Sequence, residues 1–169
     1  MSPSPFIVEW IDRIAREHGG GHALDVAMGR GRHAIPLARA GFRTFGVDVA
    51  FDMVASAVHG AAAEGCHLLA WCADLTAHPL PASQFDLVVV CRYLQRDLFP
   101  ALRASVTPGG VVLYETFTTA QLRFERGPRS PDHLLAPGEL RRQFDGFEIL
   151  FYEELDTPDA VARIAARRI

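Results

Sequence analysis

Three aspartates, each inside or directly after a short apolar run, are the residues best placed to do chemistry in this chain of 169 residues. They are Asp25, Asp48 and Asp74. Soon after the first of them come Gly29 and Gly31, which permit a tight turn and a close approach of backbone to a ligand. A turn that leads into a helix exposes unpaired N–H groups and the positive end of the helix dipole. The pattern therefore predicts a ligand site at this turn, with acids around it.

Apolar runs alternate with helix-like segments along the chain, and this alternation predicts how the acids are positioned. The predicted strands are 22–27, 43–49, 66–73, 85–91, 111–117, 147–154 and 159–168. The predicted helices are 5–17, 33–40, 51–64, 97–106 and 137–144. Strand followed by helix, repeated in this way, indicates right-handed crossovers and an open, doubly wound α/β sheet that is mostly parallel. The last segment is rich in alanine and suits a helix by propensity, but the topology favours a strand.

Two features within this order bear on the site. The run 85–91 is almost entirely apolar and β-branched, which is typical of a central parallel strand buried on both faces. The segment 118–136 is polar, and a connection of this length inside a compact domain is usually functional or mobile.

Composition limits the classes of function. A chain that is 49% hydrophobic and of this length predicts one domain over residues 1–169. The formal net charge of −3 argues against a nucleic-acid partner. Cys66, Cys72 and Cys91 lack metal-ligand spacing, so we expect free thiols, no metal site and a reducing compartment. No leader-like start and no apolar run long enough to span a bilayer are present, so we expect a cytoplasmic protein without a membrane contact. The oligomeric state is not indicated.

The turn fits two kinds of ligand. Residues 29–34 match the G-x-G-x-x-G/A pattern of dinucleotide sites, and Asp48 follows Gly29 at the distance expected of an acid on ribose hydroxyls. An NAD(P)-binding Rossmann enzyme is therefore one interpretation. It uses only the second acid, whereas a cationic ligand that carries an ammonium group also gives Asp25 a role.

The run 24–31 resembles motif I of the class I S-adenosylmethionine-dependent methyltransferases, with Ala27 in place of the first glycine. The resemblance extends over nearly the whole chain, through 85–90 as the fourth strand and 108–110 as the lead-in to the fifth. It is nearest to the small tellurite methyltransferase-like branch, on Gly-Arg-His in the turn, Arg-Tyr-Leu at 92–94 and Tyr-Glu-Thr-Phe at 114–117. The resemblance implies a seven-stranded sheet whose last strand is antiparallel and lies between the fifth and sixth.

The resemblance also implies S-adenosyl-L-methionine as cofactor, S-adenosyl-L-homocysteine as product and a role for each acid. Asp25 orients the turn or meets the methionine amino group, Asp48 takes the ribose hydroxyls and Asp74 receives the adenine amino group. The implied cofactor residues are Asp25, Ala27, Gly29, Gly31, Asp48, Val49, Met53, Asp74, Leu75 and Cys91.

Residues after the fourth and fifth strands are expected near the acceptor. Candidate catalytic residues are Tyr93 and Glu115, and candidate substrate residues are Arg92, Arg96, Phe117 and Arg129. The interpretation is a methyltransferase that acts on an unidentified small molecule by in-line methyl transfer, with a general base needed only if the acceptor must lose a proton. The alternatives are the NAD(P)-binding enzyme and a non-catalytic binding protein with the methyltransferase fold.

Overall fold

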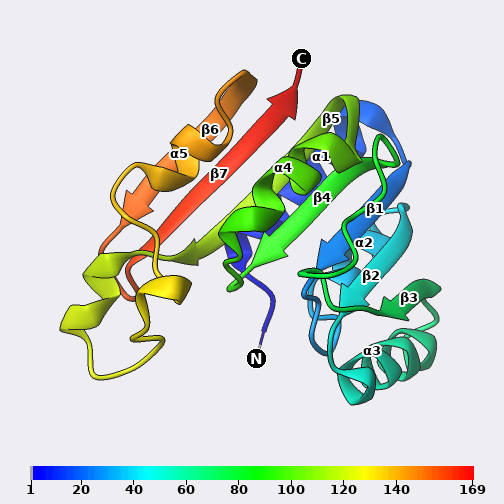
Figure 1. Cartoon of the computed structure of the whole chain (residues 1–169). Coiled ribbons are helices and arrows are strands. Elements are labelled where there is room, and N and C mark those ends of the chain that lie inside the picture. The colour runs from blue at the N-terminus through cyan, green and yellow to red at the C-terminus, as the bar shows by residue number, and fades with distance from the viewer. Residues whose placement is uncertain (1) are drawn as a thin grey trace.

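A computed structural model describes residues 2–169, and these contain a seven-stranded sheet (Figure 1). The strands are β1 (His22–Val26), β2 (Arg43–Asp48), β3 (Leu68–Cys72), β4 (Phe85–Cys91), β5 (Val106–Phe117), β6 (Phe147–Leu155) and β7 (Val161–Arg168). Their order across the sheet is β3-β2-β1-β4-β5-β7-β6. The strands from β1 to β5 pair in parallel, whereas β7 is antiparallel to both β5 and β6. The predicted α/β sheet with an antiparallel last strand is confirmed.

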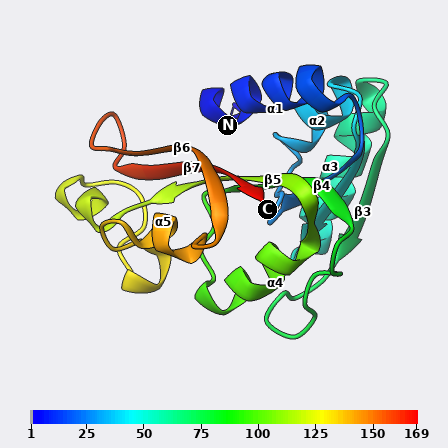
Figure 2. The same ribbon diagram turned by 90° about the horizontal axis from the view of Figure 1, so that it is seen from above.

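Helices cover both faces of the sheet (Figure 2). One face carries α1 (Pro5–His18), α2 (Ala34–Arg39) and α3 (Phe51–Ala63), and the other carries α4 (Phe99–Ser105) and α5 (Glu139–Gln143). Short 3-10 helices are η1 (Arg96–Leu98), η2 (Thr119–Arg123) and η3 (Pro131–His133). No helix within residues 2–169 has both the length and the apolar character needed to cross a membrane.

The central strand β4 is buried on both faces, as its apolar sequence predicts. Leu87 and Val89 pack in the cluster that contains the apolar face of α1, whereas Val88 and Val90 pack in the cluster beneath α4 and α5. Successive side chains of a strand point to opposite faces, so one strand contributes to both core layers. This burial fixes the carboxyl end of β4, where Cys91 lies beside the ends of β1 and β5.

The first helix begins where the sequence predicts and positions the chain before it. Ser4 is the N-cap, and its hydroxyl oxygen accepts a hydrogen bond from the Ile7 amide at 3.5 Å. Pro5 occupies the first helical position, where a missing N–H costs nothing. The predicted helix over 5–17 ends one residue later, at His18.

Some boundaries differ from the sequence predictions, for local reasons. Strand β5 begins at Val106 rather than Val111, because Val106 already pairs with Phe85 before the register shifts. Helix α2 begins at Ala34, so Pro36 falls in the first turn, where helix N–H groups have no intrahelical partner.

The segment 118–136 is held by hydrogen bonds at the carboxyl end of β5. Thr118 and Leu135 form an isolated parallel bridge, and the buried Gln121 side chain accepts a hydrogen bond from the Ala160 amide at 2.8 Å. The Arg126 carbonyl accepts a hydrogen bond from the same side chain. These contacts connect the segment to the start of β7 and to the candidate site.

Candidate functional site

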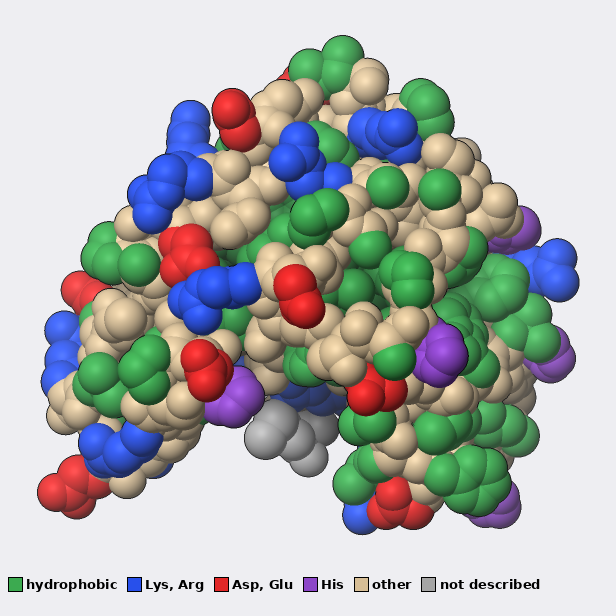
Figure 3. Space-filling view, in the orientation of Figure 1, with side chains coloured by type: hydrophobic (Ala, Val, Ile, Leu, Met, Phe, Trp, Pro, Cys, Tyr) green, Lys and Arg blue, Asp and Glu red, His purple; other side chains and the backbone are tan. Residues whose placement is uncertain are grey.

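The candidate site lies at the carboxyl ends of β1, β2 and β4, the lower edge of the sheet in Figure 1, which is hollowed in Figure 3. One cavity there, the glycine-turn cavity, has a volume of about 270 Å³. Its lining residues are Asp25, Ala27, Met28, Gly29, Arg30, Arg32, His33 and Cys91. Four residues expected from the sequence at a cofactor site therefore share one cavity.

The turn after β1 has three residues with left-handed backbone. Ala27, Gly29 and Gly31 have φ values of 52°, 54° and 77°. A Cβ on Gly29 would meet nothing within 4 Å, whereas a Cβ on Gly31 would lie 3.1 Å from the Cβ of Ala57 on α3. Gly29 thus keeps backbone exposed to the cavity, while Gly31 permits close packing of the turn on α3. Ala27 tolerates a conformation that L residues rarely adopt, as strained positions at functional sites often do.

Asp25 is the buried carboxyl group of this cavity. Its side chain is 1% exposed, and within residues 2–169 its Oδ2 atom has no hydrogen-bond partner. Burial raises the pKa of its carboxyl group to about 7, and the charge of nearby Asp48 acts in the same direction. A buried acceptor without a donor is costly, so a cationic or N–H group of a ligand would be stabilised here.

Asp48, at the end of β2, connects the glycine turn to the start of α3 through hydrogen bonds. Its Oδ2 atom accepts a hydrogen bond from the Gly29 amide at 2.8 Å, and its Oδ1 atom accepts one from the Ala50 amide at 3.0 Å. Each carboxylate oxygen has more than one acceptor position, so Asp48 can still bind ligand hydroxyls.

Asp74 extends the row of acids to the third strand. The Ala73 amide donates to the Asp48 carbonyl at 3.0 Å, so the two strand ends lie side by side. Hydrogen bonds from the Thr76 hydroxyl and amide lower the pKa of Asp74, which keeps it ionised. Near these acids, Val49 is 67% exposed, whereas Met53 and Leu75 are half-buried.

A second, larger cavity adjoins the first. This arginine cavity has a volume of about 570 Å³ and shares Arg32 with the glycine-turn cavity. Its lining residues are Ser2, Pro3, Ser4, Pro5, Arg32, Arg92, Glu115, Phe117, Pro158, Asp159 and Arg163. Arg92, Glu115 and Phe117 are residues that the sequence places near the acceptor.

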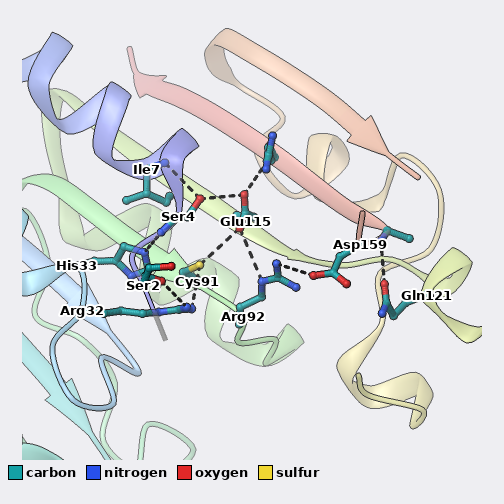
Figure 4. A network of polar contacts seen from close by, with 12 residues as sticks. Ser2, Ser4, Ile7, Arg32, His33, Cys91, Arg92, Glu115, Gln121 and Asp159 are labelled. Atoms are coloured by element: carbon teal, nitrogen blue, oxygen red, sulfur yellow. Dashed lines mark hydrogen bonds and ion pairs between the residues drawn. The ribbon is translucent and has the colours of Figure 1, made fainter. Parts of the chain in front are cut away.

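Glu115 is the centre of a buried polar network (Figure 4). It is 2% exposed and lies in one cross-strand row with Cys91 of β4 and Arg163 of β7. Arg163 Nε donates to its Oε2 atom at 2.6 Å and Ser4 Oγ donates at 3.1 Å. Arg92 Nε lies 3.7 Å from its Oε1 atom. Its carboxylate is thus occupied in holding two arginines and the N-cap of α1.

Arg32 and His33 belong to the site but are absent from the sequence predictions. Arg32 donates to the Ser2 carbonyl at 3.3 Å and to the Cys91 sulfur at 3.4 Å (Figure 4). His33 Nε2 accepts a hydrogen bond from the Ser4 amide at 3.0 Å. Burial and the adjacent Arg32 charge lower the pKa of His33 to about 3, so it is neutral. Their position directly after Gly31 was the available signal.

Three of the residues predicted near the acceptor line neither cavity. The predicted cofactor residues outside both linings are Gly31, Asp48, Val49, Met53, Asp74 and Leu75. Tyr93 donates a hydrogen bond to Gln95, and burial and the charges of Asp74, Asp97 and Asp48 raise its pKa. Arg96 makes a bidentate pair with Glu139 at 2.7 and 3.1 Å. Arg129 donates to the Phe124 carbonyl at 2.9 Å. The contacts of both arginines hold segments of the chain together.

Cys91 is a buried free thiol in the lining of the glycine-turn cavity. Burial and the negative charge of Glu115 raise its pKa to about 12. The thiol is therefore protonated at neutral pH, so it is an uncharged part of the cavity lining and not a nucleophile.

Comparison with known proteins bears on this arrangement. A family model described as a methyltransferase domain matches residues 23–110, which include all but the first residue of β1, the turn, and β2 to β4. No curated protein sequence matches the chain.

Solved structures share the fold at low sequence identity. TehB from Haemophilus influenzae superposes with a TM-score of 0.77 at 19% identity, over 95% of this chain and 62% of that chain. This chain thus spans less than two thirds of the length of TehB. An S-adenosylmethionine-dependent methyltransferase from Mesorhizobium loti gives 0.75 at 22% identity, over 95% and 98% of the two chains. Magnesium protoporphyrin IX methyltransferase from Synechocystis, solved with bound S-adenosylhomocysteine, gives 0.72 at 18% identity, over 96% and 82%.

Proposed function

From the premise that the chain belongs to the methyltransferase domain family, as a class I S-adenosylmethionine-dependent enzyme, we propose that it methylates a small molecule held in the arginine cavity. One observation carries the proposal. The unpaired buried oxygen of Asp25 lies in a glycine-lined cavity that adjoins a second cavity large enough for an organic acceptor.

The residues of the glycine-turn cavity fit S-adenosylmethionine. Asp25 offers an unpaired carboxylate oxygen for the cationic amino group, and Gly29 leaves the backbone accessible. Asp48 is assigned to the ribose hydroxyls, and Asp74 to the adenine amino group. Residues assigned to the remaining cofactor contacts are Ala27, Gly31, Val49, Met53, Leu75 and Cys91.

Arg32 is the cation best placed to receive the carboxylate of the cofactor. It lines both cavities, and its two hydrogen bonds, to the Ser2 carbonyl and the Cys91 sulfur, involve no carboxylate. A guanidinium group has five donors and suits a carboxylate. When bound, S-adenosylmethionine supplies a methyl group on a positively charged sulfur.

The chain's contribution to the reaction is positioning and the exclusion of water. In-line displacement at carbon is accelerated mainly by fixed orientation of the reacting groups. Glu115 holds Arg92 and Arg163, and Ser4 connects the same carboxylate to the start of α1. We therefore assign Glu115 a positioning role rather than that of a general base. Tyr93 is assigned to the adenine side, where burial and then the charges of neighbouring aspartates raise its pKa.

Ligand binding distinguishes the proposal from the dinucleotide alternative. We expect S-adenosylhomocysteine to bind the folded protein in calorimetric titration and reduced nicotinamide dinucleotide to show no change in fluorescence. Binding of the dinucleotide with no binding of S-adenosylhomocysteine would reverse the assignment.

Turnover is tested separately. Incubation with S-adenosylmethionine and a panel of small acceptors should release S-adenosylhomocysteine, measured by mass spectrometry. Tight binding of S-adenosylhomocysteine without release on any acceptor would favour the non-catalytic binding protein instead.

A further inference from the structure

We propose that the arginine cavity binds a small organic anion, with the acidic group of this acceptor on Arg92 and its apolar part against Phe117. The inference names the acceptor class, and so it rests on the proposed function. It is carried by the charge, shape and hydrogen bonds of the cavity that adjoins the glycine turn.

The charged groups that line the cavity have a positive excess. They are Arg32, Arg92 and Arg163 against Glu115 and Asp159. Glu115 is nearly inaccessible and receives hydrogen bonds from Arg163 and Ser4. Asp159 is shared between Arg92 and a further guanidinium, that of Arg126, at 3.3 and 3.1 Å. Both acids are therefore neutralised by partners already present, one of which, Arg126, lies outside the lining. Because Arg32 is assigned to the carboxylate of the cofactor, Arg92 is the guanidinium that remains for an acceptor.

Arg92 is held in place by its neighbours, but some of its N–H donors are free to bind a ligand. Its guanidinium carbon lies 4.1 Å from the centre of the Phe117 ring, and one of its terminal nitrogens donates to Asp159 at 3.3 Å. Its side chain is 27% exposed. Because guanidinium has five N–H donors, Arg92 retains donors for an oxyanion of a ligand. Its rigid setting reduces the entropy lost on binding.

The size and the apolar walls of the cavity exclude a bare inorganic ion as the best occupant. A volume of about 570 Å³ lies in the range of pockets for organic ligands. Phe117 and the prolines Pro3, Pro5 and Pro158 form apolar parts of the lining. An organic body buries this surface, which an ion surrounded by water would leave hydrated.

The bound donor reinforces the same charge preference. Methyl donors of this family carry a positive sulfur, so an anionic acceptor is attracted towards the adjoining cavity, and a cationic one is repelled. Arg32 lines both cavities, and the neutral thiol of Cys91 beside it lines the glycine-turn cavity, so neither adds negative charge.

The test uses three fluorinated probes of the same shape and different charge. These are 4-fluorobenzoate, neutral 4-fluorobenzamide and cationic 4-fluorobenzylamine, followed by fluorine-19 NMR line broadening with the full chain saturated with S-adenosylhomocysteine. We expect benzoate to bind at least tenfold more tightly than the other two. Equal binding of benzoate and benzamide, or tightest binding of benzylamine, would overturn the proposal.

Variants locate the benzoate on Arg92. Arg92→Gln should weaken benzoate binding at least tenfold, and Asp159→Asn should strengthen it severalfold because it removes a competing acid. Arg13→Gln, on the exposed surface of α1, is the matched control and should change nothing. The increase expected for Asp159→Asn cannot come from misfolding. Benzoate binding unaffected by both cavity variants would overturn the assignment.

Binding of S-adenosylhomocysteine, measured on the same samples, separates the two proposals. If it binds and benzoate does not, the acceptor class is wrong and the proposed function stands. If benzoate binds through Arg92 but S-adenosylhomocysteine does not bind, the anion site stands and the proposed function fails.

Discussion

Asp48 combines two tasks in one side chain. Its oxygens accept hydrogen bonds from the Gly29 and Ala50 amides, and the same carboxylate is assigned to the ribose hydroxyls. Asp48→Ala should weaken S-adenosylhomocysteine binding by about 1–3 kcal/mol, through loss of charge-assisted hydrogen bonds. Calorimetric titration measures this effect. Asp52→Ala, on the exposed first turn of α3, is the control, and unchanged affinity in a folded Asp48→Ala variant would remove Asp48 from the site.

The two glycines of the turn differ in what surrounds them. Gly31→Ala would bring a Cβ to 3.1 Å from Ala57 at a φ of +77°, whereas Gly29→Ala meets open space at +54°. Both changes carry the cost of left-handed backbone, of about 1 kcal/mol. We expect Gly31→Ala to lower the free energy of unfolding more than Gly29→Ala, as measured by urea denaturation. Equal losses of unfolding free energy would show that α3 moves to accommodate the added methyl group without an energetic cost.

The sequence predicts which residues lie in the site wherever a single strand or turn determines their position. Asp25, Asp48 and Asp74 follow from strand ends, and the structure places them around one edge of the sheet. The sequence predicts that both glycines keep ligand access open. A Cβ on Gly29 would meet nothing within 4 Å, whereas a Cβ on Gly31 would contact Ala57 of α3. That distinction depends on a helix twenty residues away in the chain and is not visible in the local pattern.

The backbone just before α1 is held in place by the neutral side chain of His33. His33 accepts a hydrogen bond from the Ser4 amide, and its pKa is lowered to about 3. The folded protein therefore binds fewer protons than the unfolded chain between pH 6.5 and 3, so stability is full above pH 6.5 and falls as the pH decreases. From pH 7 to 5, wild type should lose about 2 kcal/mol more than His33→Gln.

Thermal or urea unfolding at the two pH values measures this difference. The raised pKa of Asp25 acts in the opposite direction, but it is common to both proteins and cancels in the comparison. His59→Gln, on the exposed surface of α3, is the matched control and should retain the pH dependence of wild type. The same pH dependence in His33→Gln would contradict the neutral, buried state of His33.

At the scale of elements, periodicity predicted strands and helices but not their tertiary anchors. The alanine-rich end of the chain is a strand, β7, because it pairs with both β5 and β6 and is buried there. Long-range pairing overrides helix propensity in that segment. Arg96 was expected at the acceptor, yet its bidentate contact with Glu139 ties η1 to α5. Such pairings depend on distances that local sequence does not encode.

At the scale of the molecule, sheet order assembles the arginine cavity from distant parts of the chain. Cys91, Glu115, Arg163 and Glu153 are successive neighbours across β4, β5, β7 and β6. Arg163 and Asp159 could not be assigned from the sequence, because their position depends on the insertion of β7 beside β5. The resemblance predicted that insertion, but not which side chains face the cavity.

The central claim is that the buried, unpaired carboxylate of Asp25 receives the cationic amino group of the cofactor. Its pKa of about 7 means that it is largely protonated at pH 6, so binding an ammonium group there must release a proton. Calorimetric titration with S-adenosylhomocysteine at pH 6, in two buffers of different ionisation enthalpy, measures this release. We predict that wild type releases close to one proton and that Asp25→Asn, if it binds, releases none. Absence of binding by the folded wild-type protein, or binding without proton release, would contradict the account.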